Sequence, residues 1–270
     1  PVGPCFLKKP VGVSDFNRVR SEYFMQYLEG GDIKSDPYME KYLAVCDEDF
    51  STEKGWREAR ANYFANITLV DGMVGEIISS LERNNISDNT IIVFTSEHGE
   101  MMGDHGLLEK RALYEEASRV PLLFKIPWMG KNQKIIDGSV SHIDLVPTLL
   151  DLIGEEVPDH LQGKSRKGVF EGIDDLDGNY VIVQWNGSGE IPDRNLGSES
   201  INNLNASPWR SIIIDRLKLN LCATDKPELF DLNQDEFEEK NVFDKYEYRN
   251  SVIQLYKSMK NWQKVSEDTA

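Results

Sequence analysis

The sequence is short of positive charge, of cysteine and of long apolar runs. Its 270 residues include 30 Lys and Arg against 46 Asp and Glu, which gives a formal net charge of −16. A chain this acidic is poorly suited to bind phosphate backbones, because neutralising phosphates takes clustered cations. We therefore expect no nucleic-acid partner.

The three cysteines, Cys5, Cys46 and Cys222, lie far apart in the sequence. Their odd number allows at most one intrachain disulfide, and their spacing matches no zinc site. No apolar stretch approaches the roughly 20 residues that a helix needs to cross a bilayer, so we expect no membrane span. The chain begins with Pro1 and lacks the charged and apolar regions of a signal peptide, and we interpret it as trimmed, processed or a fragment.

Periodicity in the first 163 residues predicts helices and buried strands. Residues 1–50 show no sustained pattern beyond two possible short helices, at 23–28 and 38–45. From about Thr52 to Arg83 apolar residues recur at three and four, which predicts a long helix with one buried stripe. The stripe consists of Val70, Met73, Val74, Ile77, Ile78 and Leu81. The apolar run Ile91–Phe94 is typical of a strand buried on both faces of a parallel sheet.

A second strand is predicted at 120–126 and a helix from Ser141 to Ile153, closed by Gly154. Pro147 fits this helix only if it lies in the first turn or kinks the helix. Helix, strand, strand and helix with short connections fit a layered α/β/α domain over residues 1–163.

Beyond residue 163 the pattern changes to short strands separated by turn residues. They are predicted at Tyr180–Trp185, Trp209–Ile214, Leu217–Leu221 and Glu228–Leu232. Asp215-Arg216 suits a tight hairpin, and a last helix carries Val252, Leu255, Tyr256 and Met259 on one face. We expect residues 164–270 to form a small C-terminal antiparallel sheet packed with a helix.

Ionisable residues gather just past the strand at Ile91–Phe94, in the segment from Thr95 to Lys110. Glu97 and His98 come first, at the strand end where ligands bind in open α/β sheets. His105 and Lys110 follow. A carboxylate and an imidazole are metal ligands, and a lysine suits a tetrahedral anion.

This segment resembles the second half of the sulfatases, which belong to the alkaline-phosphatase superfamily. The resemblance runs in order from about residue 56 to 245. It is carried by Arg60-Ala-Asn-Tyr-Phe-Ala, Thr95-Ser-Glu-His-Gly-Glu, Gly103-Asp-His-Gly-Leu, Tyr114-Glu-Glu, Arg119-Val-Pro-Leu, Asp144-Leu-Val-Pro-Thr, Gln162-Gly-Lys-Ser and Glu228-Leu-Phe-Asp-Leu. It implies an alkaline-phosphatase-like α/β fold and hydrolysis of sulfate esters on small molecules or saccharides.

The resemblance also implies roles for four residues. Glu97 and His98 occupy the pair that ligates a divalent metal, usually Ca²⁺, although the family carries Asp-His or Asp-Asn there and Glu97 is longer by one methylene. Lys110 matches a lysine that contacts the sulfate and aids the leaving oxygen. His105 either contacts the substrate or holds the loop by hydrogen bonds.

Two parts of a sulfatase site have no counterpart in this sequence. Sulfatases convert a Cys or Ser in a Cys/Ser-x-Pro-x-Arg motif to formylglycine, and no such motif is present. The paired aspartates that precede it and complete the metal site are also absent. Since Ca²⁺ seeks six to eight oxygen ligands, we expect this chain to be an inactive half-site that needs the missing N-terminal half of the enzyme.

Three other interpretations stay open. The nearest enzyme alternative to a sulfatase is a phosphonate or phosphate monoester hydrolase of the same superfamily, since these can share the metal pair and the lysine. The chain is also compatible with a noncatalytic sulfatase-like binding module, in which Glu97 reflects relaxed metal ligation. It also fits one chain of a mature two-chain enzyme.

Overall fold

The computed structural model describes residues 12–13, 52–107, 109–110, 112–130, 132–187 and 207–269. The short helices expected at 23–28 and 38–45 lie outside these ranges. The chain divides into two compact units. Unit 1 comprises Pro1–Pro10, Asp15–Gly130 and Ser188–Ala206, and unit 2 comprises Val11–Ser14, Lys131–Gly187 and Ser207–Ala270. The domain boundary predicted at residue 163 stays a prediction.

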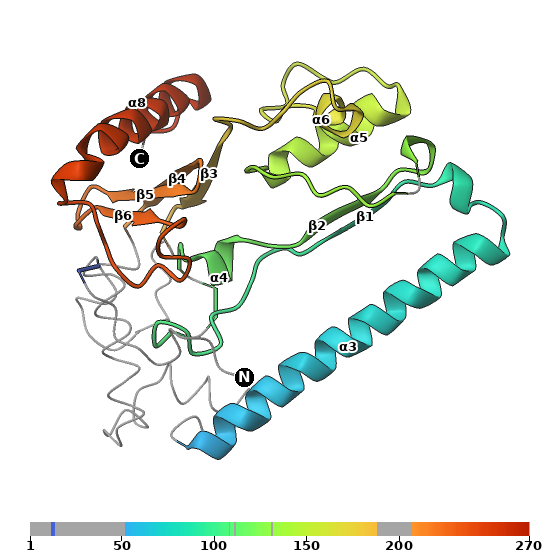
Figure 1. The fold of residues 1–270 in the computed structure, drawn as a ribbon, viewed down its shortest axis with the longest axis horizontal. Coiled ribbons are helices and arrows are strands. Elements are labelled where there is room, and N and C mark those ends of the chain that lie inside the picture. Colours follow the sequence, from blue (N-terminus) through green and yellow to red (C-terminus); the bar gives the residue numbers. More distant parts are fainter. Residues whose placement is uncertain are drawn as a thin grey trace. The chain divides into compact units, whose positions relative to one another are not determined.

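Unit 1 begins, in its described part, with the predicted long helix, α3 (Glu53–Arg83) (Figure 1). The Thr52 side chain caps its start by accepting a hydrogen bond from the Gly55 amide at 3.0 Å. Asn84 follows its last turn, as predicted, and donates its backbone N–H to the Ser80 carbonyl at 3.1 Å. Both boundaries are therefore set by local sequence.

The predicted burial of the α3 stripe is wrong for this chain. Val70, Met73 and Ile77 are 48%, 57% and 60% exposed, and the remaining members of the stripe are half-buried. The buried residues of α3 are confined to its first turn, at Gly55 and Trp56. The periodicity identified the face that is suited to packing, but periodicity does not depend on whether the packing partner is present.

By length and composition alone, α3 qualifies as a helix able to cross a membrane. Its apolar central segment contains Asp71 and Glu76, and an ionised side chain at the centre of a bilayer costs about 2.5 kcal/mol or more. The absence of a membrane span stays a prediction.

Both predicted strands of unit 1 form, as β1 (Ile92–Thr95) and β2 (Leu122–Lys125). They pair antiparallel, with Phe94 opposite Leu123, and these two side chains are 38% and 56% exposed. The expectation of a strand buried on both faces of a parallel sheet is therefore wrong within the described residues. A short apolar run fits either strand direction, and here the chain returns through the short helix α4 (Glu115–Ser118) to place β2 beside β1.

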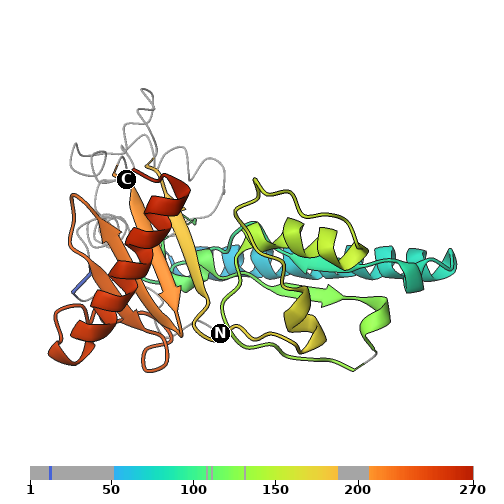
Figure 2. The ribbon, with the colours of Figure 1, turned by 90° about the horizontal axis from the view of Figure 1, so that it is seen from above.

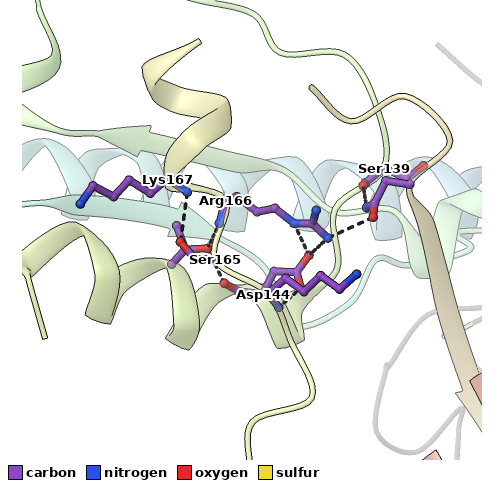
Figure 3. A network of polar contacts seen from close by, with 8 residues as sticks. Ser139, Asp144, Ser165, Arg166 and Lys167 are labelled. Atoms are coloured by element: carbon purple, nitrogen blue, oxygen red, sulfur yellow. Dashed lines mark hydrogen bonds and ion pairs between the residues drawn. The ribbon is translucent and has the colours of Figure 1, made fainter. Parts of the chain in front are cut away.

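Unit 2 contains the predicted helix α5 (Leu145–Ile153), with Pro147 in its first turn and Gly154 as a left-handed cap. The 3-10 helix η4 (His142–Asp144) leads into it. Buried Asp144 accepts hydrogen bonds from the Lys164 amide at 2.9 Å and the Arg166 Nε at 2.8 Å. Figure 3 shows these contacts, which tie the segment before α6 (Lys167–Glu171) to the start of α5.

The C-terminal part of unit 2 is the predicted antiparallel sheet. Its strands are β3 (Tyr180–Trp185), β4 (Trp209–Ile214), β5 (Leu217–Cys222) and β6 (Glu228–Asp231), in that spatial order. Asp215 and Arg216 form the predicted hairpin, both with positive φ, which is the type I′ geometry that matches strand twist. These strand positions were predictable because turn residues separate the apolar runs.

Helix α8 (Arg249–Ser266) crosses one face of this sheet (Figure 2). Ile212, Leu219 and Leu229 from the sheet pack with Leu255 and Met259 from the helix. Tyr256, which the sequence placed on the same face, is 49% exposed, so the buried stripe of α8 is narrower than predicted.

Charged and polar side chains are buried on the opposite face of the sheet. Lys218 Nζ lies 3.0 Å from Glu238 Oε1, and both side chains are fully buried. Asn220 Nδ2 donates to Glu228 Oε2 at 3.1 Å on the neighbouring strand. Because a buried charge is tolerable only beside a partner, this face fixes the position of the turn that carries Glu238.

We predict that Glu238→Gln destabilises the chain by about 3 kcal/mol, because it leaves the ammonium of Lys218 buried without its carboxylate. Urea unfolding followed by circular dichroism measures the loss. Glu236→Gln, the same chemical change at an exposed position of the same turn, is the matched control and should be neutral within about 0.5 kcal/mol. Equal effects of the two substitutions would contradict a buried pair.

Candidate active site

The loop from Ser96 to Lys110 holds the predicted site residues and folds on itself through a series of tight turns. The Gly103 amide donates to the Leu107 carbonyl and the Met101 amide to the Glu109 carbonyl, both at 2.9 Å. Positive φ angles at Met102, His105 and Glu109, with glycines at 103 and 106, allow these reversals. Within the loop, Met101 and Leu107 are buried.

Gly99 joins this loop to α4. Its amide donates to the Ala117 carbonyl at 2.9 Å, and a Cβ at position 99 would overlap the backbone of Glu116. Only glycine permits an approach this close. Helix α4 therefore positions the backbone directly after Glu97 and His98.

Arg60 of α3 reaches the same loop from 42 residues upstream. Its Nη2 donates to the Met102 carbonyl at 2.8 Å and lies 3.8 Å from Asp104 Oδ1. Asp104 therefore lies beside this guanidinium. The sequence marked Arg60 only as part of a family motif. Its contact with Met102 could not be predicted, because no local pattern links residues that are 42 positions apart.

Glu97 and His98 converge just beyond the end of β1. His98 Nε2 lies 3.6 Å from Glu97 Oε2, with the side chains 33% and 89% exposed. His98 Nδ1 lies 2.8 Å from the Gly99 carbonyl, and a carbonyl only accepts, so Nδ1 carries the proton in that contact. In the neutral ring the lone pair of Nε2 then faces the carboxylate.

Two electron-pair donors facing each other at this distance suit a positive charge between them, either a proton on the ring or a metal ion. An oxygen and a nitrogen ligand fit part of a divalent-metal site. No group of three or more His, Cys, Asp or Glu that could hold a metal occurs within the described ranges. The pair therefore fits a metal as a partial ligand set.

His105 lies inside the loop, with its side chain 2% exposed. Its ring stacks on Tyr114 with centroids 3.9 Å apart and planes 5° apart. Its Nε2 lies 3.9 Å from Glu116 Oε2. These contacts favour the loop-holding role of the two that were open for His105, and they show Tyr114 and Glu116 as its support.

Lys110 lies at the exposed end of the loop. Among the described residues no contact joins it to Glu97 or His98. The structure thus brings together the metal-type pair and, separately, the His105 cluster, while the role of Lys110 stays a prediction.

Burial raises the pKa of Glu100 above its ordinary value, although hydrogen bonds from backbone amides oppose the shift. Its Oε1 accepts from the Met102 amide at 3.3 Å. A carboxyl whose pKa is raised by folding contributes stability at low pH, and that contribution is lost as pH rises from the ordinary value through the raised one. The ionised Glu100 carboxylate therefore lowers the free energy of unfolding at neutral pH.

We predict that Glu100→Gln makes the chain more stable at pH 7, by up to about 1 kcal/mol after allowance for solvent screening. The amide oxygen can still accept from Met102, so the loop keeps that hydrogen bond. The gain should vanish near pH 4, where Glu100 is protonated. The melting temperatures of the parent and the variant, measured in EDTA from pH 4 to pH 7, give the difference in stability. Glu155→Gln, at an exposed position, is the control. A loss of stability at pH 7 would contradict the burial cost.

Comparison with known proteins identifies related chains. The family model named Sulfatase matches residues 22–155. Choline-sulfatase of Rhizobium meliloti is 31% identical over 214 residues, which cover 77% of this chain and 38% of that protein. The chain spans about two fifths of the length of such curated relatives.

Similar chains are also found among solved structures. One, described as a complex with its substrate D-glucosamine-2-N,6-O-disulfate, has a TM-score of 0.70 and 26% identity over 87% of this chain and 46% of that chain. The phosphonate monoester hydrolase of Agrobacterium radiobacter has a TM-score of 0.63 and 29% identity over 80% of this chain and 43% of its own. The predicted alkaline-phosphatase-like α/β fold is thereby confirmed.

Proposed function

Since the chain belongs to the sulfatase family, we propose that it is the C-terminal part of a sulfuric ester hydrolase whose nucleophile lies in an upstream part. The observation that carries the proposal is the pair Glu97 and His98, which converge beyond the end of β1 in a loop fastened to α4 and α3. A strand end of this kind is where an open α/β sheet binds its ligand.

Glu97 and His98 are the residues that would hold a divalent ion, and we favour Ca²⁺ because it tolerates the variable distance that a longer Glu side chain imposes. The ion would neutralise charge that develops on the sulfate oxygens during hydrolysis. Two side chains are too few for Ca²⁺, so the remaining ligands belong to the upstream part. The Gly99 carbonyl orients the His98 ring so that Nε2 is the ligand atom.

Lys110 is assigned to the sulfate group. Its ammonium offers three donors to a tetrahedral anion and favours the negative charge that builds on the leaving oxygen. His105 is assigned a positioning role, because its stacking on Tyr114 keeps the turn between Gly103 and Leu107 in place. This turn precedes Lys110 on the same loop.

The substrate class is a sulfate monoester on a small molecule or a saccharide. The similarity to a choline-sulfatase and to a structure that holds a sulfated glucosamine supports the class, and it does not choose between the two. The formylglycine nucleophile and its paired aspartates are assigned to the upstream part, since no Cys/Ser-x-Pro-x-Arg motif occurs in this sequence.

A phosphonate or phosphate monoester hydrolase is the second candidate, and the likeness to the Agrobacterium radiobacter enzyme favours it. Sulfate, phosphate and phosphonate esters all present tetrahedral anionic centres, so the metal pair and Lys110 suit each of them. The third candidate is a noncatalytic binding module in which Glu97 reflects a weakened metal site.

We predict that the complete enzyme, this chain together with its upstream part, hydrolyses an aryl sulfate faster than an aryl phosphonate, compared by kcat/KM. Lys110→Ala should lower kcat/KM for the aryl sulfate by about 10²-fold, because it removes a donor to the developing charge. The control is Lys54→Ala, which removes an exposed lysine from the first turn of α3. Faster turnover of the phosphonate would select the second candidate, and equal loss in both variants would remove Lys110 from the site.

We predict that Glu97→Asp, which shortens the side chain to the length usual in the family, tightens Ca²⁺ binding to the complete protein by about tenfold. Titration calorimetry measures the change. Glu97→Gln should weaken binding, because it keeps the length and removes the charge. If Glu97→Asp binds Ca²⁺ no better, the noncatalytic module becomes the better description.

A further inference from the structure

We propose that the outer side of α8 is a binding surface for a sulfated polysaccharide. Its cations form a set that we call the α8 cation stripe: Arg249, Lys257, Lys260 and Lys264. The proposal rests on the proposed function, since hydrolysis of sulfate monoesters is the chemistry that brings a sulfated polymer to this chain. It also selects the saccharide, rather than the small molecule, as the carrier of the sulfate ester.

The four cations share one side of α8. Because each helical residue is rotated by about 100° from the one before it, they fall within an arc of about 80°. All four are exposed, whereas Leu255 and Met259, which pack on the sheet, are each 2% exposed. From the first cation to the last the stripe runs about 22 Å along the helix axis. It is therefore a narrow, straight row of positive charge that faces away from the sheet.

This row is not neutralised by neighbouring carboxylates. No Asp or Glu occurs in α8, although acidic residues outnumber basic ones by 46 to 30 in the whole chain. Within the described ranges no member of the stripe forms an ion pair, and Lys260 Nζ donates to the amide oxygen of Gln263 at 2.8 Å. The nearest acidic residues in the sequence, Glu247 and Glu267, lie outside the two ends of the helix. The stripe is thus a local exception to the acidity of the chain.

The positions of the cations oppose the stability of the helix that carries them. Lys260 lies three residues after Lys257 and four before Lys264, and like charges at these spacings repel each other. Arg249 is the first residue of α8, where the positive end of the helix dipole disfavours a cation. Only Lys264, in the last turn, suits the dipole. A row of bound anions would relieve this repulsion, so the stripe fits a ligand better than it fits the helix alone.

A sulfated polysaccharide matches both the charge and the length of the stripe. Ammonium and guanidinium groups bind oxyanions through charge-assisted hydrogen bonds. Sulfate groups repeated along a polymer can meet all four cations, whereas one small ester can reach only part of the row. Ile253 lies within the same arc and Tyr256 lies at its margin, and their side chains are 43% and 49% exposed. They provide apolar surface on which sugar rings can rest between the charges.

Other anionic partners fit this surface less well. A bilayer would need the apolar side of α8, and that side is packed against Ile212 and Leu219 of the sheet. Duplex DNA presents two rows of phosphates, which call for a broader cationic surface than one side of one helix. A second copy of this chain brings a formal charge of −16 against its like.

The test measures binding of the full 270-residue chain to immobilised heparin by biolayer interferometry. One variant replaces three lysines of the stripe with glutamine: Lys257→Gln, Lys260→Gln and Lys264→Gln. The matched control makes the same change, with the same loss of net charge, at three exposed lysines elsewhere: Lys54→Gln, Lys164→Gln and Lys240→Gln. Because all six lysines are exposed, both triple variants should keep the melting temperature of the parent.

We expect the stripe variant to weaken heparin binding at least tenfold and the control variant to leave it within threefold. Raising NaCl from 50 to 200 mM should weaken binding by the parent chain at least tenfold, because the cations displace counterions from the polymer. Fully desulfated heparin, which keeps the carboxylates and the sugar rings, should bind at least tenfold more weakly than heparin.

Five results would overturn the proposal: no heparin binding at 50 mM NaCl, equal losses in the two triple variants, equal binding of desulfated heparin, stripe-dependent binding of duplex DNA or phosphatidylcholine–phosphatidylserine vesicles that is tighter than that of heparin, or a stripe-dependent dimer by light scattering. Binding is measured apart from hydrolysis. Stripe-dependent heparin binding together with a complete enzyme that hydrolyses no sulfate ester would reject the proposed function alone. Hydrolysis of an aryl sulfate by a complete enzyme whose α8 binds no heparin would reject the α8 surface alone.

Discussion

The closeness of Gly99 to α4 is the constraint on which the site depends. Its amide reaches the Ala117 carbonyl at 2.9 Å, and no side chain fits between the two backbones. This contact fixes the chain immediately after Glu97 and His98, and it brings the loop against the helix that supplies Tyr114 and Glu116 to His105. The backbone contact of Gly99 therefore positions the segment that carries Glu97 and His98.

Unit 2 is organised differently, around buried charges. Asp144 with Arg166, Lys218 with Glu238 and Arg210 with Asp268 each join segments that are separated in the sequence. Buried ion pairs contribute little net stability compared with apolar packing, but an arrangement that separates the partners is costly. We interpret these pairs as devices that select one arrangement of α5, the antiparallel sheet and the C-terminal end of α8, while Leu219, Leu229 and Leu255 supply the apolar core.

The sequence predicted best what depends on neighbouring residues. The ends of α3, the helix α5 and all four strands of unit 2 follow from caps, turn residues and apolar runs, and the hairpin at Asp215-Arg216 follows from its turn geometry. The direction of β1 and the burial of the α3 stripe were not predictable, because both depend on which surfaces are present to pack against. At the site, the motif identified Glu97 and His98, but not the contact of Arg60 with Met102 or the stacking of His105 on Tyr114, which join residues that no local pattern relates.

Arg60 connects α3 to the loop of the candidate active site. The helix carries an uncovered apolar face along its length and, one turn from its buried start, a guanidinium that holds the loop of Glu97 and His98. A polypeptide bound to this face would restrain the helix and, through Arg60, the loop that Arg60 contacts at Met102. Thermodynamic linkage is reciprocal, so a metal ion that favours the ordered loop must strengthen the assembly of the two halves by the same factor by which assembly strengthens metal binding. Metal binding and assembly of the two halves would then be thermodynamically coupled.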